Sequence, residues 1–477
     1  MAKSRIIPNR ALLPRKIGIF CLLSLQLITF GRAQSVHASN SPCNELASSC
    51  TGEEHLRSKD SLQTAPANKQ LTHDDIADDY ITIEDAEIWY PILYKDKNFA
   101  KIETFVQQSL EAERSDEQVS AYLSRLYNNL SEVPSRIDST YTAEDDEQFL
   151  EHINAVDEWI STDPSSHIPY LIKGMLLREY AWETRSRHTT HTATSEALPS
   201  FSRLVTRAKT NFDIAAELNP NDPNVWRELM FSTRENSNVP KHLEETYFQA
   251  GLAANPYHIG LWGTKAMNRR PVWCGSWEEM MEIARESEQL SIEAGKTLLS
   301  TVFLGVHRHI AYHDDSFQLG HPDIWPDVQA AFLRTIEAYP ESLRMRFYYA
   351  HDAYFYADKD DIAVEQFDIL GNHWTAGTAW NDLEEYHNAR RYAYQSAAYD
   401  ALLLGNYDRA ERLALHSVEI EAHAYPYLIL ASVSNHRYQP EQMFYYAEQA
   451  LANNPTANER TQAEEAITTA RYHMNRN

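Results

Sequence analysis

The sequence predicts an all-α protein in which antiparallel helix hairpins stack on one another as an α-solenoid. Three observations point to this fold class: a proline-containing segment that recurs at the period of a helix hairpin, apolar residues at helical spacing, and a shortage of glycine. Only 14 of the 477 residues are glycine, which is less than half of the roughly 7% found on average. Doubly wound α/β enzymes and β-barrels need glycine for turns and phosphate-binding loops, so the shortage favours helices.

The recurring segment joins an Asn-Pro pair to a tryptophan. Pro220 and Pro256 are 36 residues apart, and a tryptophan follows each proline after six residues, at Trp226 and Trp262. A period of this size is typical of one helix pair per repeat. Proline disfavours helical geometry at the residue before it. It also has no backbone N–H to donate, but the N–H groups in the first turn of a helix have no partner within the helix, so proline is tolerated there. Each copy is therefore predicted to end one hairpin and begin the next, with both tryptophans facing the core. Looser copies surround Pro164, Pro340 and Pro455.

Residues 1–38 have the pattern of an export signal. Basic residues precede an apolar run from Ile17 to Phe30, which is too short to span a bilayer comfortably. The segment Val36-His37-Ala38 then fits a signal-peptide cleavage site, and Gly31-Arg32-Ala33 is a second possible site. We therefore expect a cleaved signal peptide, a periplasmic or secreted protein, and no stable membrane span after cleavage. Retention of the segment as an uncleaved anchor is the alternative.

The cysteines are interpreted in the light of export. Residues 39–75 are polar and have no apolar period, which is typical of a flexible linker. Within this linker, Cys43 and Cys50 bracket a short loop and could form a disulfide in an oxidising compartment. Cys274 lies between a tryptophan and a glycine, and we interpret it as a small, buried apolar side chain.

Helical patterning begins near residue 76. The stretch from residue 98 to residue 106 places four apolar side chains on one helix face: Phe99, Ile102, Phe105 and Val106. We predict a helical-repeat domain over residues 76–370, followed by further helix hairpins over residues 371–477.

The C-terminal stretch contains a turn motif in which Gly405 is followed by Tyr407 and Ala410. Gly405 is expected to end one helix in a left-handed conformation, and the small Ala410 lets two helix backbones approach closely. This Gly-x-Tyr-x-x-Ala pattern resembles the turn and second helix of a tetratricopeptide repeat. The resemblance implies a tetratricopeptide-like α-solenoid, with its hairpins over residues 371–477.

A second resemblance covers roughly residues 99–285. The chain has four features in the order found in a bacterial helical-repeat family that is catalogued only as a domain of unknown function. They are Asp163-Pro164-Ser165-Ser166, Ala181-Trp182-Glu183-Thr184-Arg185, Asn219-Pro220 and Pro271-Val272-Trp273-Cys274-Gly275-Ser276-Trp277. The family commonly has two glycines after its tryptophan, and Cys274 stands in place of the first. The resemblance implies a helical fold but no activity.

The formal net charge of −25 argues against nucleic acid as a partner, because phosphate binding needs a basic surface. The same charge disfavours an anionic membrane surface. It is compatible with a basic protein, a peptide or a cationic ligand, although net charge also serves solubility alone.

The strongest candidate for a metal site is the pair His309 and His313. Four residues apart, they would share one face of a helix, and Asp314 or His321 could add a ligand. However, no His-Glu-x-x-His motif is present and nothing fixes a third ligand. We therefore interpret the segment as a polar helix end and predict no metal site.

Other catalytic motifs are missing from the sequence. It has no Gly-x-Ser-x-Gly elbow, no phosphate loop and no dinucleotide fingerprint. We predict no cofactor and identify no catalytic residues. An enzyme stays open as the alternative, because catalytic triads are assembled in space rather than in sequence.

An aromatic run from Arg346 to Tyr356 offers a candidate for a binding surface. Phe347, Tyr348, Phe355 and Tyr356 suit the core between helices. Tyr349 and Tyr354 would then face a groove that binds a partner, since tyrosine combines apolar area with a polar tip. The alternative is a central helix that is buried on all sides.

Two functions remain on these grounds. The first is an exported helical-repeat scaffold that binds a protein or peptide partner. The second is an exported hydrolase on a helical scaffold, acting on a cell-wall or glycan substrate.

Overall fold

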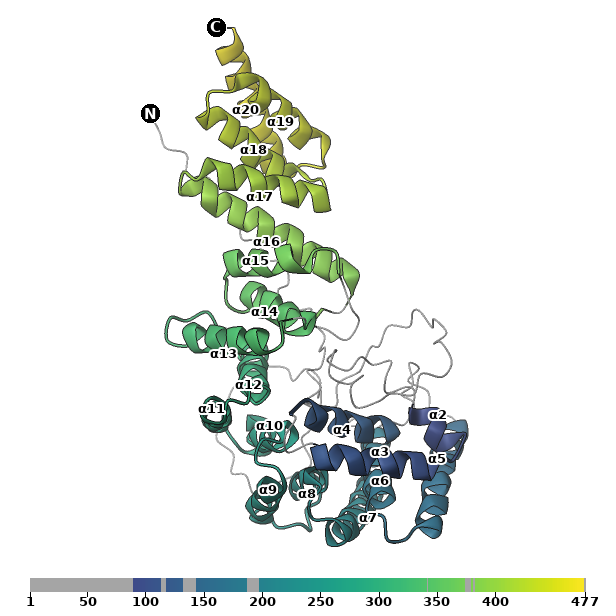
Figure 1. The fold of residues 1–477 in the computed structure, drawn as a ribbon. Coiled ribbons are helices and arrows are strands. Elements are labelled where there is room, and N and C mark those ends of the chain that lie inside the picture. Colours follow the sequence, from purple (N-terminus) through teal and green to yellow (C-terminus); the bar gives the residue numbers. More distant parts are fainter. Residues whose placement is uncertain are drawn as a thin grey trace. The chain divides into compact units, whose positions relative to one another are not determined.

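The computed structural model describes residues 89–112, 117–131, 143–186, 197–340, 342–373, 379–380 and 382–475. Every regular element in these ranges is a helix, and none of the described residues lies in a β-strand (Figure 1). The predicted all-α fold class is therefore confirmed. The predicted signal peptide, the linker, Cys43 and Cys50 lie outside the described residues and stay predictions.

The described helices form two compact units. The N-terminal unit comprises the described residues up to His307 together with Leu333–Glu341, and the C-terminal unit comprises Arg308–Phe332 and Ser342–Asn477. Helices α12 (Ser300–His313) and α13 (Trp325–Ala338) contribute residues to both units. The repeat domains predicted over residues 76–370 and 371–477 stay predictions.

The N-terminal unit contains α2 (Trp89–Tyr94), α3 (Phe99–Ala112), α4 (Glu117–Leu130), α5 (Ala143–Thr162), α6 (Ile168–Ser186), α7 (Ala197–Leu218), α8 (Pro223–Glu235), α9 (Leu243–Ala254), α10 (Ile259–Asn268), the short 3-10 turn η2 (Pro271–Trp273) and α11 (Trp277–Ala294). From α5 to α11, each α-helix packs against the next one along the chain. Helix α4 departs from this order, since it also packs against α6 and α10. Helix α8 lies in the interior of the unit, with almost all of its residues buried.

The proline-containing segments lie between helices, as predicted. Helix α7 ends before Pro220 and α9 ends before Pro256. In both places the preceding asparagine accepts a hydrogen bond from the amide two residues further on, at 3.1 Å for Asn219 and 2.9 Å for Asn255, which is a common way to close a turn. The looser copies also follow helix ends, those of α5, α13 and α19.

The two repeat tryptophans differ in burial. Trp262 is 7% exposed, whereas Trp226 is only partly buried. The prediction that both face the core is therefore correct for Trp262 and only partly correct for Trp226.

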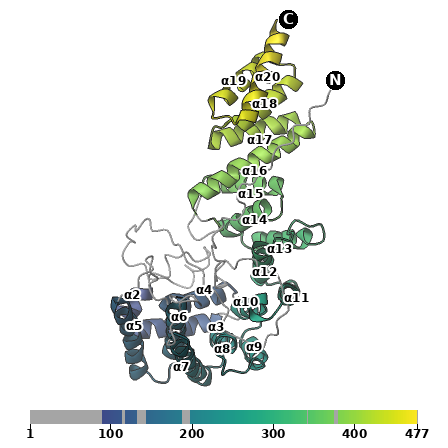
Figure 2. The ribbon, with the colours of Figure 1, turned by 180° about the vertical axis from the view of Figure 1, so that it is seen from behind.

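The C-terminal unit contains, after α13, the helices α14 (Leu343–Phe355), α15 (Asp360–Leu370), α16 (Leu383–Leu403), α17 (Tyr407–Ile420), α18 (Ala424–His436), α19 (Pro440–Ala452) and α20 (Ala457–Met474). From α14 onward each helix packs against the next, and α18 also packs against α16 and α20. The first helices of successive hairpins therefore lie side by side, as in a tetratricopeptide-like solenoid (Figures 1 and 2). Gly405, with a φ of 76°, separates α16 from α17, and it has the left-handed conformation that the sequence predicted.

The connection between α10 and α11 corrects the interpretation of Cys274. The side chain is exposed rather than buried, and the residue ends η2 with a φ of 69°. Glycine adopts this left-handed conformation readily, whereas a residue with a Cβ atom is strained in it. The glycine common at this place in the family that the segment resembles thus has a physical explanation.

Among the described residues, no helix combines the length and the apolar character that crossing a membrane requires.

Candidate functional site

The predicted groove residue Tyr349 lies in the core. Its side chain is 2% exposed and its ring stacks on Phe332 of α13, with a centroid distance of 4.7 Å. Its hydroxyl oxygen accepts a hydrogen bond from Gln329 at 2.9 Å. A side chain enclosed in this way cannot contact a partner directly, so the prediction for Tyr349 is wrong.

Tyr354 is partly exposed and packs edge-on against Phe355, and its role in a groove stays a prediction. Phe347 and Tyr348 are buried as predicted, with exposed fractions of 1% and 0%. The alternative prediction from the sequence, a central helix buried on all sides, therefore describes the middle of α14 better than the prediction of a groove does.

His309 and His313 share a face of α12, and their rings are 4.3 Å apart. His309 is 5% exposed. In the part of the chain that the structure describes, no three His, Cys, Asp or Glu side chains come together as a metal site would require. The prediction that the protein binds no metal still needs an elemental measurement.

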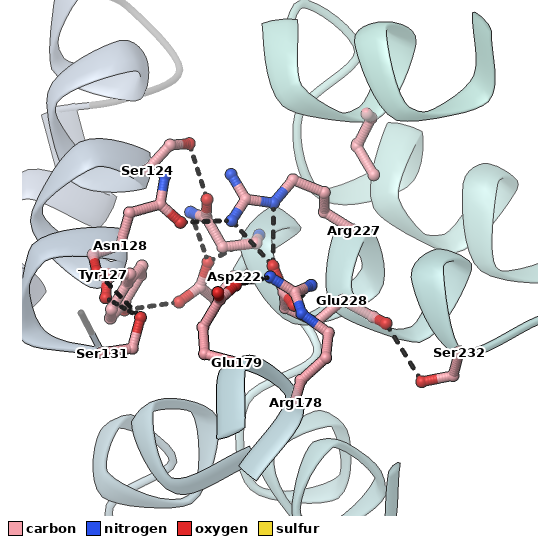
Figure 3. A network of polar contacts seen from close by, with 12 residues as sticks. Ser124, Tyr127, Asn128, Ser131, Arg178, Glu179, Asp222, Arg227, Glu228 and Ser232 are labelled. Atoms are coloured by element: carbon pink, nitrogen blue, oxygen red, sulfur yellow. Dashed lines mark hydrogen bonds and ion pairs between the residues drawn. The ribbon is translucent and has the colours of Figure 1, made fainter. Parts of the chain in front are cut away.

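The most unusual feature of the N-terminal unit is a buried polar network around α8 (Figure 3). Asp222, at the start of this helix, is fully buried. Its Oδ1 accepts hydrogen bonds from the backbone amide and side-chain amide of Asn224, at 2.9 and 3.0 Å. The residue is therefore the N-cap of α8. Aspartate is favoured at this position because its carboxylate accepts a hydrogen bond from an otherwise unpaired backbone amide and its negative charge complements the helix dipole.

The second carboxylate oxygen of Asp222 connects α8 to two other elements. Tyr127 of α4 donates a hydrogen bond to Oδ2 at 2.6 Å, and Nε2 of His167 lies 3.1 Å from the same oxygen. Burial alone would raise the pKa of Asp222, but the hydrogen bonds from His167, Tyr127 and the Asn224 amide outweigh it and hold the pKa below its ordinary value. Asp222 is therefore an ionised cap at the centre of the unit.

His258 occupies the same repeat position at the start of α10. Its Nδ1 accepts a hydrogen bond from the amide of Leu261 at 3.2 Å. Burial, with the charge of Arg227, lowers the pKa of His258 to about 3, so the ring is neutral and the network assigns its proton to Nε2. That N–H faces the hydroxyl oxygen of Ser124 at 3.1 Å, and Ser124 donates to Asn224 Oδ1 at 2.6 Å.

The tautomer of His258 determines whether this histidine could act as a general base for Ser124. A catalytic histidine must accept the proton of its serine. Here Nε2 already carries a proton, and Nδ1 is occupied by a backbone amide. The pair therefore joins α4 to α10 and supplies no activated nucleophile.

Further along α8, the carboxylate of Glu228 lies between two arginines. Arg178 of α6 donates to Oε2, and Arg227 donates to Oε1 at 2.8 Å. Arg227 also donates to Asn128 of α4 at 3.1 Å. The side chains of Arg178, Arg227 and Glu228 are 3%, 6% and 0% exposed, so this is a buried arginine–glutamate–arginine cluster.

Aromatic rings extend the cluster towards α11. The guanidinium groups of Arg178 and Arg234 lie 4.7 and 5.0 Å from the ring centre of Phe231. Arg234 is also 5.1 Å from the ring of Trp273, and it donates to Asn268 at 3.1 Å. Cations placed over aromatic faces gain energy that increases when water is excluded.

These contacts tie α4, α6, α8 and α10 together. Buried charges cost several kcal/mol each in desolvation and are tolerated only when they are paired and hydrogen-bonded. A network of this kind fixes one arrangement of helices, because any shift would leave a charge unpaired. We therefore assign it a structural role.

The C-terminal unit presents a different polar surface, which we name the tyrosine face: Tyr392, Gln395, Tyr399, His423 and Tyr425. All five side chains are partly exposed. The first three lie at positions i, i+3 and i+7 of α16, and therefore on one side of that helix. His423 and Tyr425 come from the start of the neighbouring helix α18.

The members of the tyrosine face contact one another. The rings of Tyr399 and Tyr425 are 6.2 Å apart, and those of Tyr392 and His423 are 6.4 Å apart. His423 Nε2 lies 2.6 Å from Gln395 Oε1. Tyrosine and histidine rings held in place by neighbours lose little entropy when a ligand arrives, and such side chains are typical of recognition surfaces.

Charged groups border the tyrosine face at both ends. The guanidinium of Arg391 lies 4.1 Å from the ring centre of Tyr392, and its Nε is 3.0 Å from Glu421 Oε2. At the other end, burial raises the pKa of Tyr425, and Tyr399, Glu459 and Asp400 raise it further. Tyr425 therefore stays protonated.

Comparison with known proteins adds little. No family model matches the chain, so the resemblance to the uncharacterised bacterial family stays a prediction. No curated protein matches it either. Among solved structures, the crystal structure of yeast Tom70 is similar at 13% identity and a TM-score of 0.30, over 73% of this chain and 64% of that one. At this TM-score the similarity carries no argument, and the fold assignment depends on the helix packing described above.

Proposed function

We propose that this protein is an exported helical-repeat scaffold that binds a protein or peptide partner through its C-terminal hairpins. The observation that carries the proposal is the tyrosine face. It places partly exposed aromatic side chains with polar tips on α16 and α18, the helices that lie side by side in successive hairpins. Tyrosine is enriched where proteins bind one another, because it combines large apolar area with hydrogen bonding.

Export is the second part of the proposal. It is motivated by the basic and apolar pattern of residues 1–38, and it implies a periplasmic or secreted location. Mass spectrometry of the protein purified from its own cells should find a mature N-terminus near residue 34 or residue 39. A full-length chain in the cytosolic fraction would contradict export without touching the binding proposal.

The hydrolase alternative has no comparable support. Ser124 and His258 contact each other, but their hydrogen bonds run in the wrong direction for a catalytic nucleophile and base.

Partner capture tests the binding proposal. The wild-type protein, expressed from its whole gene and cross-linked in the envelope fraction of its source cells, should retain a partner that the double variant Tyr399→Ser with Tyr425→Ser loses. The matched control is Tyr438→Ser with Tyr445→Ser, which removes two tyrosines that are 88% and 55% exposed outside the tyrosine face. Equal capture by all three proteins, each melting like the wild type, would overturn the proposal.

A further inference from the structure

We propose that the Tyr399–Tyr425 end of the tyrosine face receives a cationic side chain, a lysine or an arginine, from a protein partner. This inference depends on the proposed binding function and specifies its chemistry. Three helices carry it, because α16 supplies Tyr399 and Asp400, α18 supplies Tyr425, and α20 supplies Glu459.

Helix packing brings these groups together. Ala424, next to Tyr425, and Ala463, one turn after Glu459, belong to one buried cluster between α18 and α20. The small alanines let the beginnings of α18 and α20 approach closely, and Tyr425 and Glu459 lie near these two helix starts. The effect of both Glu459 and Asp400 on the Tyr425 hydroxyl indicates the same proximity.

The rings at this end suit a cation. Tyr399 and Tyr425 have a centroid distance of 6.2 Å and an interplanar angle of 49°, so the two rings are not stacked face to face. A cation within about 6 Å of an aromatic face is attracted by the ring quadrupole. Carboxylates beside the rings add charge attraction, and the net charge of −25 would favour the approach of a basic partner.

The opposite end of the face shows the same chemistry within the chain. There Arg391 lies over the ring of Tyr392 and pairs with Glu421. The protein itself therefore combines a tyrosine, a carboxylate and a cation 4.1 Å from the ring centre. An anionic peptide would meet Asp400 and Glu459 with like charge, so a carboxylate-bearing ligand is disfavoured.

A peptide titration of the full-length protein tests the inference. The probe is a fluorescent peptide of about ten residues that alternates lysine and serine, and its reference is the same peptide with acetylated lysines. The lysine peptide should bind more tightly, because acetylation removes the charge. Asp400→Asn with Glu459→Gln should weaken its binding about tenfold, which is the effect of about 1.4 kcal/mol. Glutamine preserves the capping interaction that Glu459 makes with Thr456.

A matched control separates this site from the overall charge. Glu441→Gln with Glu448→Gln removes two exposed charges from α19 and should leave the affinity within about twofold, since exposed charges away from the site are screened by salt. An equal loss in both double variants would show that net charge alone attracts the peptide, and the inference would be overturned. Equal binding of the acetylated peptide would overturn it as well.

Ring variants at constant charge complete the test. Tyr399→Leu with Tyr425→Leu should weaken the lysine peptide about tenfold, whereas Tyr399→Phe with Tyr425→Phe should retain its binding because the rings remain. Retention in the leucine variant would overturn the inference. If the peptide results fail while the envelope partner still depends on Tyr399 and Tyr425, the cation chemistry is wrong and the binding function stands. If capture also fails, both proposals fall.

Discussion

The indole nitrogen of Trp226 donates a hydrogen bond to the carbonyl oxygen of Pro220 at 2.8 Å, across the junction between α7 and α8. Trp262 makes the same bond to Pro256 at 3.0 Å, across the junction between α9 and α10. The six-residue spacing in the sequence is therefore the spacing that returns the indole N–H to the turn carbonyl. In each case a tryptophan in the first turns of the following helix is hydrogen-bonded to the proline that follows the end of the preceding helix.

Substitution of the two tryptophans should have unequal effects. Trp262→Ala should lower the free energy of unfolding by about 3–5 kcal/mol, because it removes a buried ring. Trp226→Ala should cost less, since that ring is partly exposed. Trp226→Phe should cost at least about 1 kcal/mol, because it removes the hydrogen bond together with part of the ring. Urea denaturation of the three variants measures this, and equal losses for both alanine variants would contradict it.

Glu228 should be among the most sensitive positions of the N-terminal unit. Glu228→Gln leaves Arg227 buried without its anion and leaves Arg178 only the more distant carboxylate of Glu179, at 3.4 Å. The expected loss of stability is about 3–5 kcal/mol. The triple substitution Arg178→Met, Arg227→Met and Glu228→Leu removes all three charges and should recover most of this loss. A triple variant no more stable than Glu228→Gln, by thermal or urea denaturation, would show that the cluster does more than satisfy its own charges.

His258 should make the unit sensitive to acid. An unfolded histidine titrates near pH 6.5, whereas the pKa of folded His258 is about 3. Below about pH 6.5 this histidine binds a proton in the unfolded chain but stays neutral in the folded chain. The stability that is present above this pH is therefore lost progressively towards about pH 3. Between about pH 7.5 and about pH 4.5 this one group should remove on the order of 2–3 kcal/mol.

The variant His258→Asn isolates this effect. Asparagine retains the capping function and does not titrate, so the variant should lose less stability between the two pH values than the wild type. His242→Asn, at an exposed position, serves as the control and should behave like the wild type. Identical pH profiles for the wild type and His258→Asn would contradict the assignment of a neutral His258.

Cys274→Gly should stabilise the protein. The left-handed conformation at Cys274 costs roughly 1–2 kcal/mol for a residue with a Cβ atom, and the extra entropy of an unfolded glycine offsets about 0.5–1 kcal/mol of the gain. A net increase of about 0.5–1 kcal/mol should appear as a higher melting temperature. Cys274→Ala, which retains the Cβ atom, should give no such increase.

The turns were predictable from sequence, but the polar network and the tyrosine face were not. Proline and glycine act on the backbone within a few residues, so Pro220, Pro256 and Gly405 located helix ends without knowledge of the fold. The bond between Tyr127 and Asp222 joins residues 95 positions apart, and no local pattern pairs them. The spacing of Tyr392 and Tyr399 on one side of α16 was a usable signal. Their neighbour Tyr425 depends on how α18 packs.

Tyr349 was misplaced for a related reason. Aromatic residues fill so many positions between Arg346 and Tyr356 that the run has no clear apolar period, and periodicity cannot tell an inner side from an outer one. The stacking of Phe332 and the hydrogen bond from Gln329 decide that Tyr349 is internal. Both partners come from α13, outside the run itself.

The contact between α4 and α10 has a consequence for the order in which the chain acquires structure. Ser124 and His258 are 134 positions apart, so the contact between α4 and α10 cannot form until α10 has been synthesised. Until then the polar side of α4 is hydrated, and no local pairing can bury it. In the C-terminal unit, by contrast, hairpins can form as they emerge, because the main packing of α14 to α20 is between first and second neighbours. Long sequence separation slows folding, so the part of the chain that is synthesised first is expected to be the part that matures last.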